Sequence, residues 1–424
     1  MENIFLGVER SISGRCWTGP NIAVDRKAEM IIQENNFSSA MANVLARLGV
    51  EANQAKNYTQ PSLRDLMPNP LKILDMEKAA SRINLAVENH EQVAIFADYD
   101  VDGATSGALL HDWLTQLGIL PTLYVPDRIE EGYGPNVEAM EMLSNNHDLI
   151  ICVDCGTLSH EPINKITNTD IIILDHHLGG ETLPNAYAVV NPNRQDEKGD
   201  LYYLCAAGVV FLTLVAANSI LRKKNKPTPE LLNMLDLVAL GTVADVAPLI
   251  GFNRALVRQG LKIMAKRQRI GLTALTDVAK MNNAPTPYHL GYLLGPRINA
   301  GGRVGKADLG IRLLTCKDYN EANSIAEKLN QLNDERRNIE SMVQFQALEQ
   351  VEKRGTNNTL VWAAGEGWHP GVVGIVASRI KEITNKPTVI IGLDEDLGKG
   401  SGRSVSGIDL GSSIASLQRE NLIT

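Results

Sequence analysis

The stretch VAIFADYDVDGATSG, residues 93–107, is the part of the chain from which the fold can be inferred. Its five apolar residues at 93–97 predict a buried strand, and Asp98, Asp100 and Asp102 then occupy every second position. In an extended backbone, alternate side chains point to the same side. Three carboxylates would therefore crowd at a strand end, which is costly in a dry cleft unless cations neutralise them. A solvated acidic turn is the alternative interpretation of this motif alone.

The bulk composition predicts an ordinary globular protein in the cytoplasm. The chain has 424 residues, enough for two or three domains, and is 44% hydrophobic and 21% charged. We find no apolar run as long as a membrane span, no secretory signal and no spaced cysteine framework, so we expect no membrane contact. The net charge of −8 argues against a basic coat for duplex DNA, but it leaves room for a local basic groove.

Apolar runs alternate with helical segments after residue 90, which predicts an α/β fold. Runs that are apolar at every position indicate a parallel sheet covered on both faces. The predicted strands are 93–97, 122–125, 149–153 and 171–174, and the predicted helices between them lie near 104–117, 136–144 and 160–167.

The wider pattern divides the chain into four parts. We expect an N-terminal helical region over 1–60, an α/β domain over 61–270 and a helical connector over 271–355. The connector includes a long charged helix from about 318, and a smaller, incomplete α/β domain follows over 356–424. Within the first two parts, single helices are predicted at 40–52 and 71–89.

Three of the predicted strands end in aspartate, at Asp98, Asp154 and Asp175. Ligands of an open parallel sheet bind outside the carboxyl ends of its strands, so these carboxylates should share one edge. His176 and His177 follow the third strand; alone they could be structural, but here a ligand role is favoured. Asp245, within GTVADVAPL, could join them or merely cap a helix.

The pooled side chains predict a site for two hard divalent cations. Carboxylates with one imidazole suit Mn²⁺ or Mg²⁺ better than zinc or copper. A pair of such cations clamps the attacking and leaving oxygens of a phosphoryl displacement. A CxxC motif at Cys152 and Cys155 suggests a zinc site as an alternative, but no second pair of ligands is spaced for it. We therefore interpret these cysteines as packing residues. The set comprises Asp98, Asp100, Asp102, Asp154, His176 and Asp245.

Three glycine-rich stretches offer basic side chains. GPRINAGGRVGK (295–306) is expected to be a flexible loop, GWHPGVVGIVASR (367–379) leads into a helix start, and KGSGRS (399–404) adds Lys399 and Arg403. Each signal is weak by itself. Together they predict a phosphate-binding wall that faces the acidic edge across a cleft between two domains.

The motifs resemble a known family. ADYDVDGATS, VDCGT, LDHH and GTVADVAPL are similar, in order, to the four motifs of the DHH phosphoesterases. VPDRIEEGYGP, GPRINAGGR, GWHPGVVGIVASRI and KGSGRS resemble those of the RecJ family, bacterial single-strand-specific 5′→3′ exonucleases. The similarity runs from about residue 40 to the end of the sequence. It implies that 61–270 is a DHH catalytic domain and 356–424 part of a DHH-associated substrate-binding domain.

The resemblance also implies roles for individual residues. Asp98, Asp100 and Asp102 would serve two metals, Mn²⁺ preferred and Mg²⁺ usable, with Asp154 as the bridge. His176 and Asp245 would complete the second site, while His177, beside Asp175, would touch the scissile phosphate. The residues implied to hold the strand are Arg303, His369, Arg379, Lys399 and Arg403, and Arg128 and Tyr133 lie in the loop used near the DNA end and its bases.

The implied activity is 5′→3′ hydrolysis of single-stranded DNA in repair and recombination, with single-strand-binding protein and a helicase as partners. One alternative is a DHH phosphodiesterase for oligonucleotides or cyclic dinucleotides, but such relatives typically have histidine at the position of Asp98 and lack the long connector. Another is a weak or non-catalytic DNA-binding relative. RecJ proteins continue into a GGGHxxAAG motif and an OB-like domain, neither of which is in this sequence, so we expect a fragment or a truncated protein.

Overall fold

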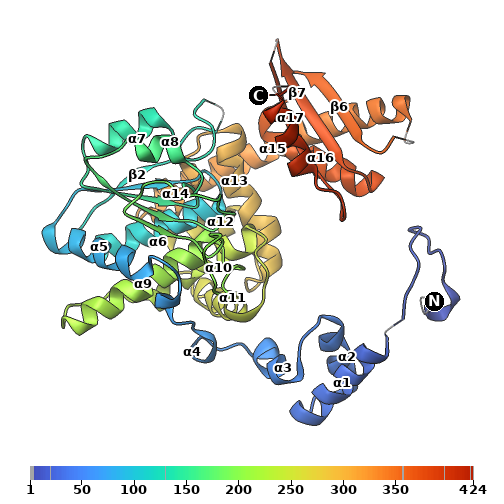
Figure 1. Ribbon diagram of the computed structural model, residues 1–424, viewed down its shortest axis with the longest axis horizontal. Helices are drawn as coiled ribbons and strands as arrows, with labels where there is room; N and C mark the ends of the chain where they lie inside the picture. The colour runs from blue at the N-terminus through green and yellow to red at the C-terminus, as the bar shows by residue number, and fades with distance from the viewer. Residues whose placement is uncertain are drawn as a thin grey trace.

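The computed structural model describes residues 4–19, 21–128, 130–355, 358–395, 397–420 and 422–423. Two α/β units are connected by one long helix, and a small helical bundle lies near the N-terminus (Figure 1). The predicted fold class, a parallel-sheet α/β domain with a second, smaller α/β domain, is confirmed.

The larger unit is built on a five-stranded parallel sheet with the order β2-β1-β3-β4-β5. Its strands are β1 (Val93–Ala97), β2 (Thr122–Tyr124), β3 (Leu149–Val153), β4 (Asp170–Leu174) and β5 (Ala188–Val190). The four predicted strands are confirmed, and β5 adds a fifth that the sequence interpretation missed. Ala97 pairs with Val153, and Val153 pairs with Leu174, so the carboxyl ends of the three central strands are level.

Helices cover both faces of this sheet, which explains why its central strands are apolar throughout (Figure 1). One face packs on α5 (Met76–Asn89), α6 (Val101–Gln116) and α9 (Ala206–Lys223). The other packs on α7 (Val137–Ser144) and α8 (His160–Asn164). Cys152 and Cys155 are buried in the core of this second face, in agreement with a packing role.

The expectation that no apolar run reaches the length of a membrane span is wrong for helix α9. By length and composition alone, α9 is sufficient to cross a membrane. However, 72% of it is buried inside the protein. It packs between the sheet and neighbouring helices, and a helix enclosed on most sides is apolar on most sides.

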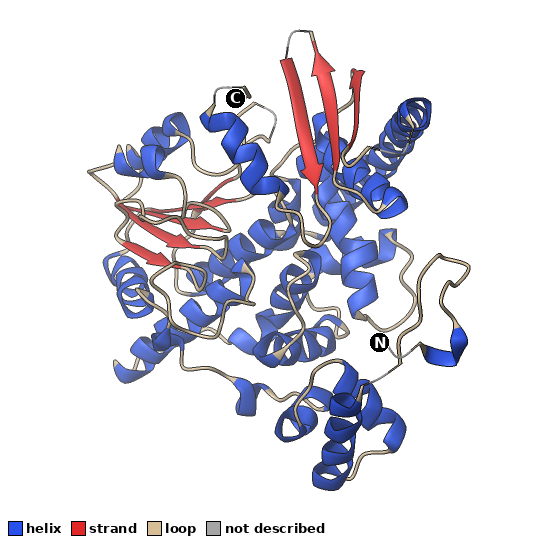
Figure 2. Ribbon diagram, turned by 45° about the vertical axis from the view of Figure 1, so that its right-hand side comes forward, coloured by secondary structure: helices blue, strands red, loops and turns tan. Residues whose placement is uncertain are grey.

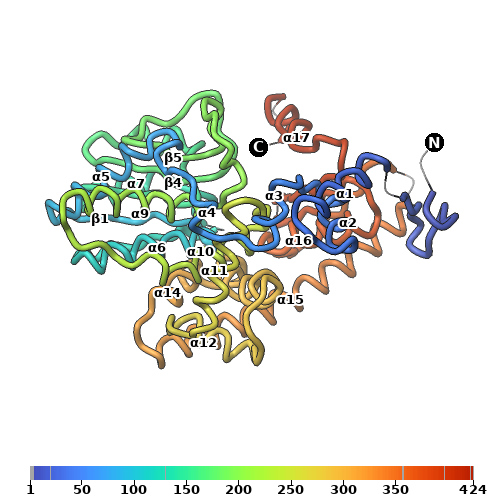
Figure 3. The backbone as a smooth tube through the Cα atoms, turned by 90° about the horizontal axis from the view of Figure 1, so that it is seen from below, coloured from blue at the N-terminus to red at the C-terminus, as the bar shows by residue number. Residues whose placement is uncertain are grey.

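A helical layer follows the sheet in the chain (Figure 3, where α12, α14 and α15 gather at one side). Its elements are η3 (Leu231–Met234), α10 (Leu235–Ala244), α11 (Gly251–Met264), α12 (Ile270–Val278), the π-helical turn η4 (His289–Leu294), α13 (Gly295–Val304), α14 (Leu309–Thr315) and α15 (Tyr319–Arg354). The predicted long helix is confirmed as α15.

The predicted flexible loop at 295–306 is wrong, because most of it forms helix α13. Pro296 lies in the first turn, where its missing N–H costs nothing. The glycines serve close packing rather than flexibility: a Cβ on Gly302 would lie 2.7 Å from the Tyr99 carbonyl oxygen.

The smaller unit has a three-stranded sheet, separate from the first (Figure 2). It consists of β6 (Val361–Glu366), α16 (Pro370–Thr384), β7 (Thr388–Asp394), β8 (Leu397–Arg403) and α17 (Leu410–Arg419). KGSGRS, expected as a basic loop, lies mostly in β8 and pairs antiparallel with β7. Glycine-rich sequence is a poor strand former, so tertiary pairing decides this element.

The N-terminal elements also differ from prediction. They are η1 (Phe5–Gly7), α1 (Ile22–Asn35), α2 (Ser39–Arg47), α3 (Ala52–Thr59), α4 (Leu63–Leu66) and η2 (Pro70–Lys72). The predicted helix 40–52 is broken near Gly49, which has φ +77°, a conformation that glycine adopts without strain. The predicted helix 71–89 begins only at Met76, because Asp75 has φ +59° and its carboxylate accepts a hydrogen bond from the Val189 amide of β5.

Candidate metal centre

Acidic side chains meet at the carboxyl edge of the larger sheet. Asp98, Asp154 and Asp175 directly follow β1, β3 and β4, which are neighbours in the sheet. The order 2-1-3-4-5 reverses direction at β1 and β3, and this is where ligands of doubly wound sheets bind.

The structure brings all six predicted metal ligands together. In each of three groups, the potential ligand atoms lie within 4.8 Å of one another. The groups are Asp98, Asp100 and Asp154; Asp102, His176 and Asp245; and Asp154, His176 and His177. Since Asp154 and His176 occur in two groups each, the three groups form one continuous cluster.

His176 is central to the cluster. Its Nε2 lies 3.3 Å from Asp154 Oδ1 and 3.8 Å from Asp102 Oδ2, and its Nδ1 lies 3.9 Å from Asp245 Oδ2. One imidazole thus reaches carboxylates from three different elements.

Tight turns hold the first motif in place. Asp100 caps α6, and its Oδ1 accepts hydrogen bonds from the amides of Asp102 (2.8 Å) and Gly103 (3.1 Å). A Cβ at Gly103 would lie 2.3 Å from the Asp98 carbonyl oxygen, so only glycine fits there. Asp154 has φ +62°, a strained conformation that is common at functional sites.

Asp102 links the cluster to two further helices. Its carboxylate accepts hydrogen bonds from the amides of Ala206 (2.6 Å) and Ala207 (3.0 Å), in the first turn of α9. A Cβ at Gly241 in α10 would lie 2.8 Å from Asp102 Oδ1, so glycine allows α10 to approach. This close approach places Asp245, which follows the last residue of α10, beside the cluster.

Asp175 orients the two histidines. Its Oδ1 accepts hydrogen bonds from the amides of His176 (2.7 Å) and His177 (3.2 Å) and lies 2.8 Å from His177 Nδ1. Its Oδ2 accepts from the Thr157 amide. Burial opposes ionisation of Asp175, but the hydrogen bonds from His177 and Thr157 outweigh it and lower its pKa. The same hydrogen bond raises the pKa of His177. Tyr133 Oη donates to the Asp154 carbonyl (3.0 Å) and lies 3.3 Å from His177 Nε2.

The sequence interpretation overlooked two asparagines that support the histidines. Asn191 Nδ2 donates to Thr157 Oγ1 (2.9 Å) and to the His177 carbonyl (2.8 Å). Asn193 Nδ2 donates to the His176 carbonyl (2.6 Å). Both follow β5, so the short apolar run AVV followed by NPN was the available signal.

Replacing Asn191 by alanine is expected to weaken Mn²⁺ binding about 10- to 100-fold, the usual cost of losing an outer partner of a metal site. Isothermal titration calorimetry measures this loss. The matched control is Asn218→Ala, which removes a buried asparagine bonded to Trp113 away from the cluster. This variant should lose stability but keep its Mn²⁺ affinity; equal weakening in both variants would contradict the assigned role.

Burial and mutual repulsion make the carboxylates hard to ionise without cations. Burial raises the pKa of Asp102 although attraction to His176 opposes the rise. Burial, followed by repulsion from neighbouring carboxylates, raises the pKa of Asp98 and Asp154. The pKa of Asp245 rises to about 8 for the same reasons. Asp98 Oδ1, Asp154 Oδ1 and His176 Nε2 are buried without a hydrogen-bond partner among the described residues. Buried polar atoms without partners are costly, and hard divalent cations would satisfy all three, so the residues fit such ions.

The metal-free protein should lose stability as the pH rises. Between about pH 4, where an unfolded aspartate titrates, and pH 8, the folded state binds more protons than the unfolded state. We therefore expect the melting temperature in EDTA to fall from pH 6 to pH 8.5, measured by differential scanning fluorimetry. Asp245→Asn should make this decline shallower, and Mn²⁺ should stabilise more at the higher pH. A melting temperature that rises over this range would contradict the interpretation.

Of the predicted strand-binding residues, Tyr133 contacts the cluster directly through its hydrogen bond to the Asp154 carbonyl. The Arg128 guanidinium lies 5.1 Å from the centre of the ring of Tyr99, which lies between Asp98 and Asp100 in the chain. Arg303, in α13, donates to the Gly371 carbonyl of α16 (2.9 Å), and His369 caps α16. Burial, with repulsion from Arg128 and then Arg336, lowers the pKa of Arg303 to about 10.

The other three predicted residues lie on the smaller unit. Arg379 pairs with Glu340 of α15 (3.3 Å), and Lys399 and Arg403 are on β8. Arg403 donates to Ser401 Oγ within the same strand. Within the described ranges, none of the three forms a hydrogen bond or ion pair with the acidic cluster.

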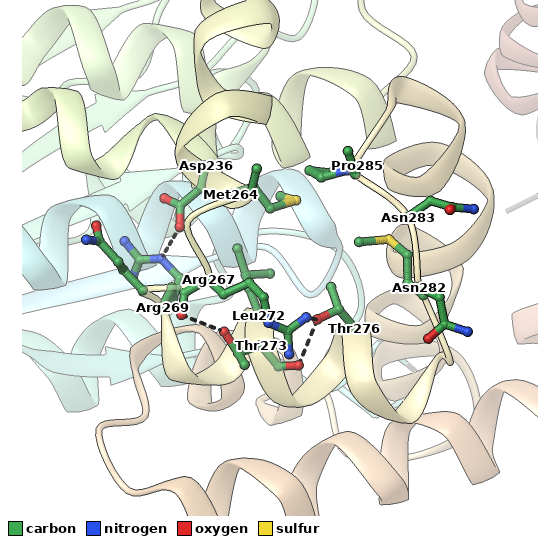
Figure 4. Close-up of a pocket in the computed structure, with 14 residues that line it drawn as sticks. Asp236, Met264, Arg267, Arg269, Leu272, Thr273, Thr276, Asn282, Asn283 and Pro285 are labelled. Carbon is green, nitrogen blue, oxygen red and sulfur yellow. Dashed lines mark hydrogen bonds and ion pairs between the residues drawn. The ribbon is translucent and has the colours of Figure 1, made fainter.

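A pocket of ≈ 260 Å³ lies at the other end of α10, away from the cluster (Figure 4). Its wall includes Arg267, Arg269, Thr273 and Thr276. The arginines are engaged there: Arg269 pairs with Asp236, and Arg267 donates to Thr276 (Figure 4). This pocket is therefore a feature of the scaffold.

Comparison with known proteins agrees with this geometry. The family model "DHH family, N-terminal domain" matches residues 92–242, and the DHHA1 domain model matches residues 357–420. The single-stranded-DNA-specific exonuclease RecJ of Dickeya dadantii is 37% identical over 89% of this chain and 68% of its own length. This chain belongs to the RecJ family. RecJ of Bacillus subtilis is 34% identical over 92% of this chain, which spans only 49% of that relative.

Solved RecJ structures share the fold. A crystal structure of exonuclease RecJ bound to manganese matches with a TM-score of 0.72 and 32% identity, covering 82% of this chain and 86% of that one. RecJ from Thermus thermophilus in complex with Mn²⁺ matches with a TM-score of 0.79 and 28% identity, over 94% of this chain and 56% of that one. The same protein in complex with Mg²⁺ matches with a TM-score of 0.72, 28% identity and coverages of 94% and 54%.

Proposed function

We propose that this chain is a 5′→3′ exonuclease that hydrolyses phosphodiester bonds in single-stranded DNA with two divalent cations, Mn²⁺ preferred and Mg²⁺ usable. The observation that carries the proposal is the cluster of six ligand side chains with unpartnered buried atoms at its centre. The naming of curated RecJ relatives and the Mn²⁺ and Mg²⁺ complexes of RecJ support it.

The residues divide into two ligand sets around Asp154. We assign Asp98, Asp100 and Asp154 to one cation, and Asp102, His176 and Asp245 to the other, in line with the observed groups. Asp154, whose Oδ1 lies 3.3 Å from His176 Nε2, would also serve the second cation as the bridge. When bound, the two cations would lower the pKa of a bound water and clamp the attacking and leaving oxygens of the phosphoryl group.

We propose that His177 contacts the scissile phosphate. Its side chain is 44% exposed beside Asp154, and Asp175 favours its protonated form. A cationic imidazole donates charge-assisted hydrogen bonds to phosphate oxygens. Asp175 is a positioning residue in this proposal, since both its oxygens are occupied by His176, His177 and Thr157.

The junction of α13 and α16 supplies the proposed phosphate-binding wall. Arg303 and His369 lie there, and Arg128 is close enough to both to lower their pKa values, after burial. Tyr133 would stack on a base near the 5′ end, a contact that tolerates any sequence. We propose that Arg379, Lys399 and Arg403 hold the strand farther from the reaction.

A labelled single strand tests the proposal. With Mn²⁺, the protein should release mononucleotides from the 5′ end and leave duplex DNA and 3′ ends intact; EDTA should stop the reaction. Varying the strand from two to about fifty nucleotides tests the alternative. Faster turnover of dinucleotides than of long strands would favour a small-substrate phosphodiesterase.

The setting of this activity is also proposed. We infer a role in DNA repair and recombination in the cytoplasm, with single-strand-binding protein and a helicase as partners, from the family resemblance. We also propose domain boundaries at residues 60, 270 and 355. Pull-down with purified single-strand-binding protein, with and without single-stranded DNA, tests the first partnership.

A further inference from the structure

Two exposed tyrosines stack on one another at the π-helical turn η4: Tyr288 directly precedes the turn and Tyr292 lies within it. The rings of Tyr288 and Tyr292 have centroids 5.1 Å apart and planes 25° apart. Tyr288 is 66% exposed and Tyr292 is 74% exposed. A surface aromatic pair of this kind offers flat apolar faces to solvent, and π-helical turns are frequent at functional sites.

This turn packs on the helix that leads to Asp245, and α13, which continues from the turn, contacts the start of α6. A Cβ on Gly291 would lie 3.4 Å from Val243 Cγ1, and one on Gly295 would lie 3.3 Å from Ala244 Cβ, so η4 packs on the last turn of α10. Asp245 directly follows α10 in the chain. In α13, which continues from η4, Asn299 Oδ1 accepts a hydrogen bond from the Val101 amide (3.0 Å), at the start of α6.

Helical spacing then locates the tyrosines. Residues 291, 295 and 299 lie four apart and form the stripe that faces α10 and α6. Residues 290, 294 and 298 form a buried stripe on one side of it. Tyr288 and Tyr292, also four apart, lie on its other side and are exposed.

An exposed valine adds an apolar contact next to a candidate metal ligand. Val246 follows Asp245 directly, has φ +60° and is 85% exposed. A β-branched residue in this conformation is strained, and strain at such a place points to function. Hydrogen bonds from the amides of Val246 and Ala247 to the end of α10 keep the turn closed.

We propose that Tyr288 and Tyr292, together with Val246 after the end of α10, form a stacking platform for unpaired bases of the single strand that enters the metal centre. The inference rests on the proposed function and names a second base-contacting surface besides Tyr133. Unpaired bases fit this surface because stacking on an aromatic face tolerates any sequence, as a nuclease without sequence preference requires. Because η4 packs on Val243 and Ala244, which directly precede Asp245, the platform lies at the end of α10 that carries this ligand.

Binding of single-stranded oligonucleotides to the full chain in EDTA tests the platform. Replacing Tyr288 and Tyr292 together by alanine should weaken binding between about 5-fold and 150-fold, the range for loss of one base stacked on an aromatic ring. Tyr288→Phe with Tyr292→Phe should keep the affinity, because the rings remain. Tyr319→Ala, which removes an exposed tyrosine at the start of α15, is the matched control and should also keep it.

Abasic oligonucleotides separate stacking from other effects. The double alanine variant and the unmodified protein should bind them equally. A defect that persists on abasic strands, or equal binding of normal strands by both proteins, would overturn the platform while leaving the proposed function intact. Failure of the unmodified protein to bind or degrade single strands would instead refute the proposed function itself.

Discussion

Replacing Asp154 by asparagine is expected to reduce Mn²⁺-dependent release of nucleotides from single-stranded DNA roughly a thousandfold or more. Asp154 belongs to two of the three ligand groups, so its loss disturbs both proposed cation positions. Metal stabilisation of the transition state amounts to several kcal/mol, and each 1.36 kcal/mol corresponds to about a tenfold change in rate. Calorimetric titration should also show the loss of at least one bound Mn²⁺.

Asparagine is the right replacement because of the backbone. Asp154 has φ +62°, which asparagine adopts more readily than alanine, so the fold should survive. Asp277→Asn, at an exposed aspartate paired with Arg267, is the matched control and should leave the rate unchanged. An Asp154→Asn rate within tenfold of the unmodified protein would refute the two-cation assignment.

Arg269→Met is expected to lower the free energy of unfolding by about 3–5 kcal/mol, because it removes the cation paired with buried Asp236 and one of the partners of buried Asp112. Arg269 Nη1 lies 2.7 Å from Asp112 Oδ2, and Nε lies 3.0 Å from Asp236 Oδ2 (Figure 4 shows the contact with Asp236). The three side chains are only 11%, 9% and 5% exposed. Through this arginine, α6 and α10 are tied to the start of α12. Urea unfolding measures the loss.

Arg267→Met is the matched control for this variant. Arg267 pairs with Asp277 at 2.6 Å, but both side chains are exposed, so we expect a loss below about 1 kcal/mol. An equal loss in both variants would contradict the buried network.

Acid should narrow the difference in the free energy of unfolding between the Arg269→Met variant and the unmodified protein. Burial opposes ionisation of Asp112, but contacts with His111, Arg269 and Lys317 outweigh it and lower its pKa. Its stabilising contribution is therefore present above about pH 4, where an unfolded aspartate titrates, and disappears at lower pH. The gap in the free energy of unfolding should thus be wider at pH 7 than at about pH 3, where part of this contribution is lost.

The sequence by itself determined the sheet and the composition of the metal centre. Continuous apolar runs at 93–97 and 149–153 specify strands buried on both faces, which only a parallel sheet with two helical layers provides. Aspartates that end three such runs must then meet, because the carboxyl ends of parallel strands share one edge. Both inferences use local pattern and a general rule of topology.

Tertiary structure alone decided the features that depend on contacts between distant segments. GPRINAGGRV is a helix because its glycines pack against Tyr99 and neighbouring elements, and KGSGRS is mostly a strand because β7 pairs with it. The support of the histidines by Asn191 and Asn193, and the capping of α9 by Asp102, join residues that are 14 to 105 positions apart. Local preference is weak at such glycine and asparagine positions, so the energy of long-range packing and hydrogen bonding selects the conformation.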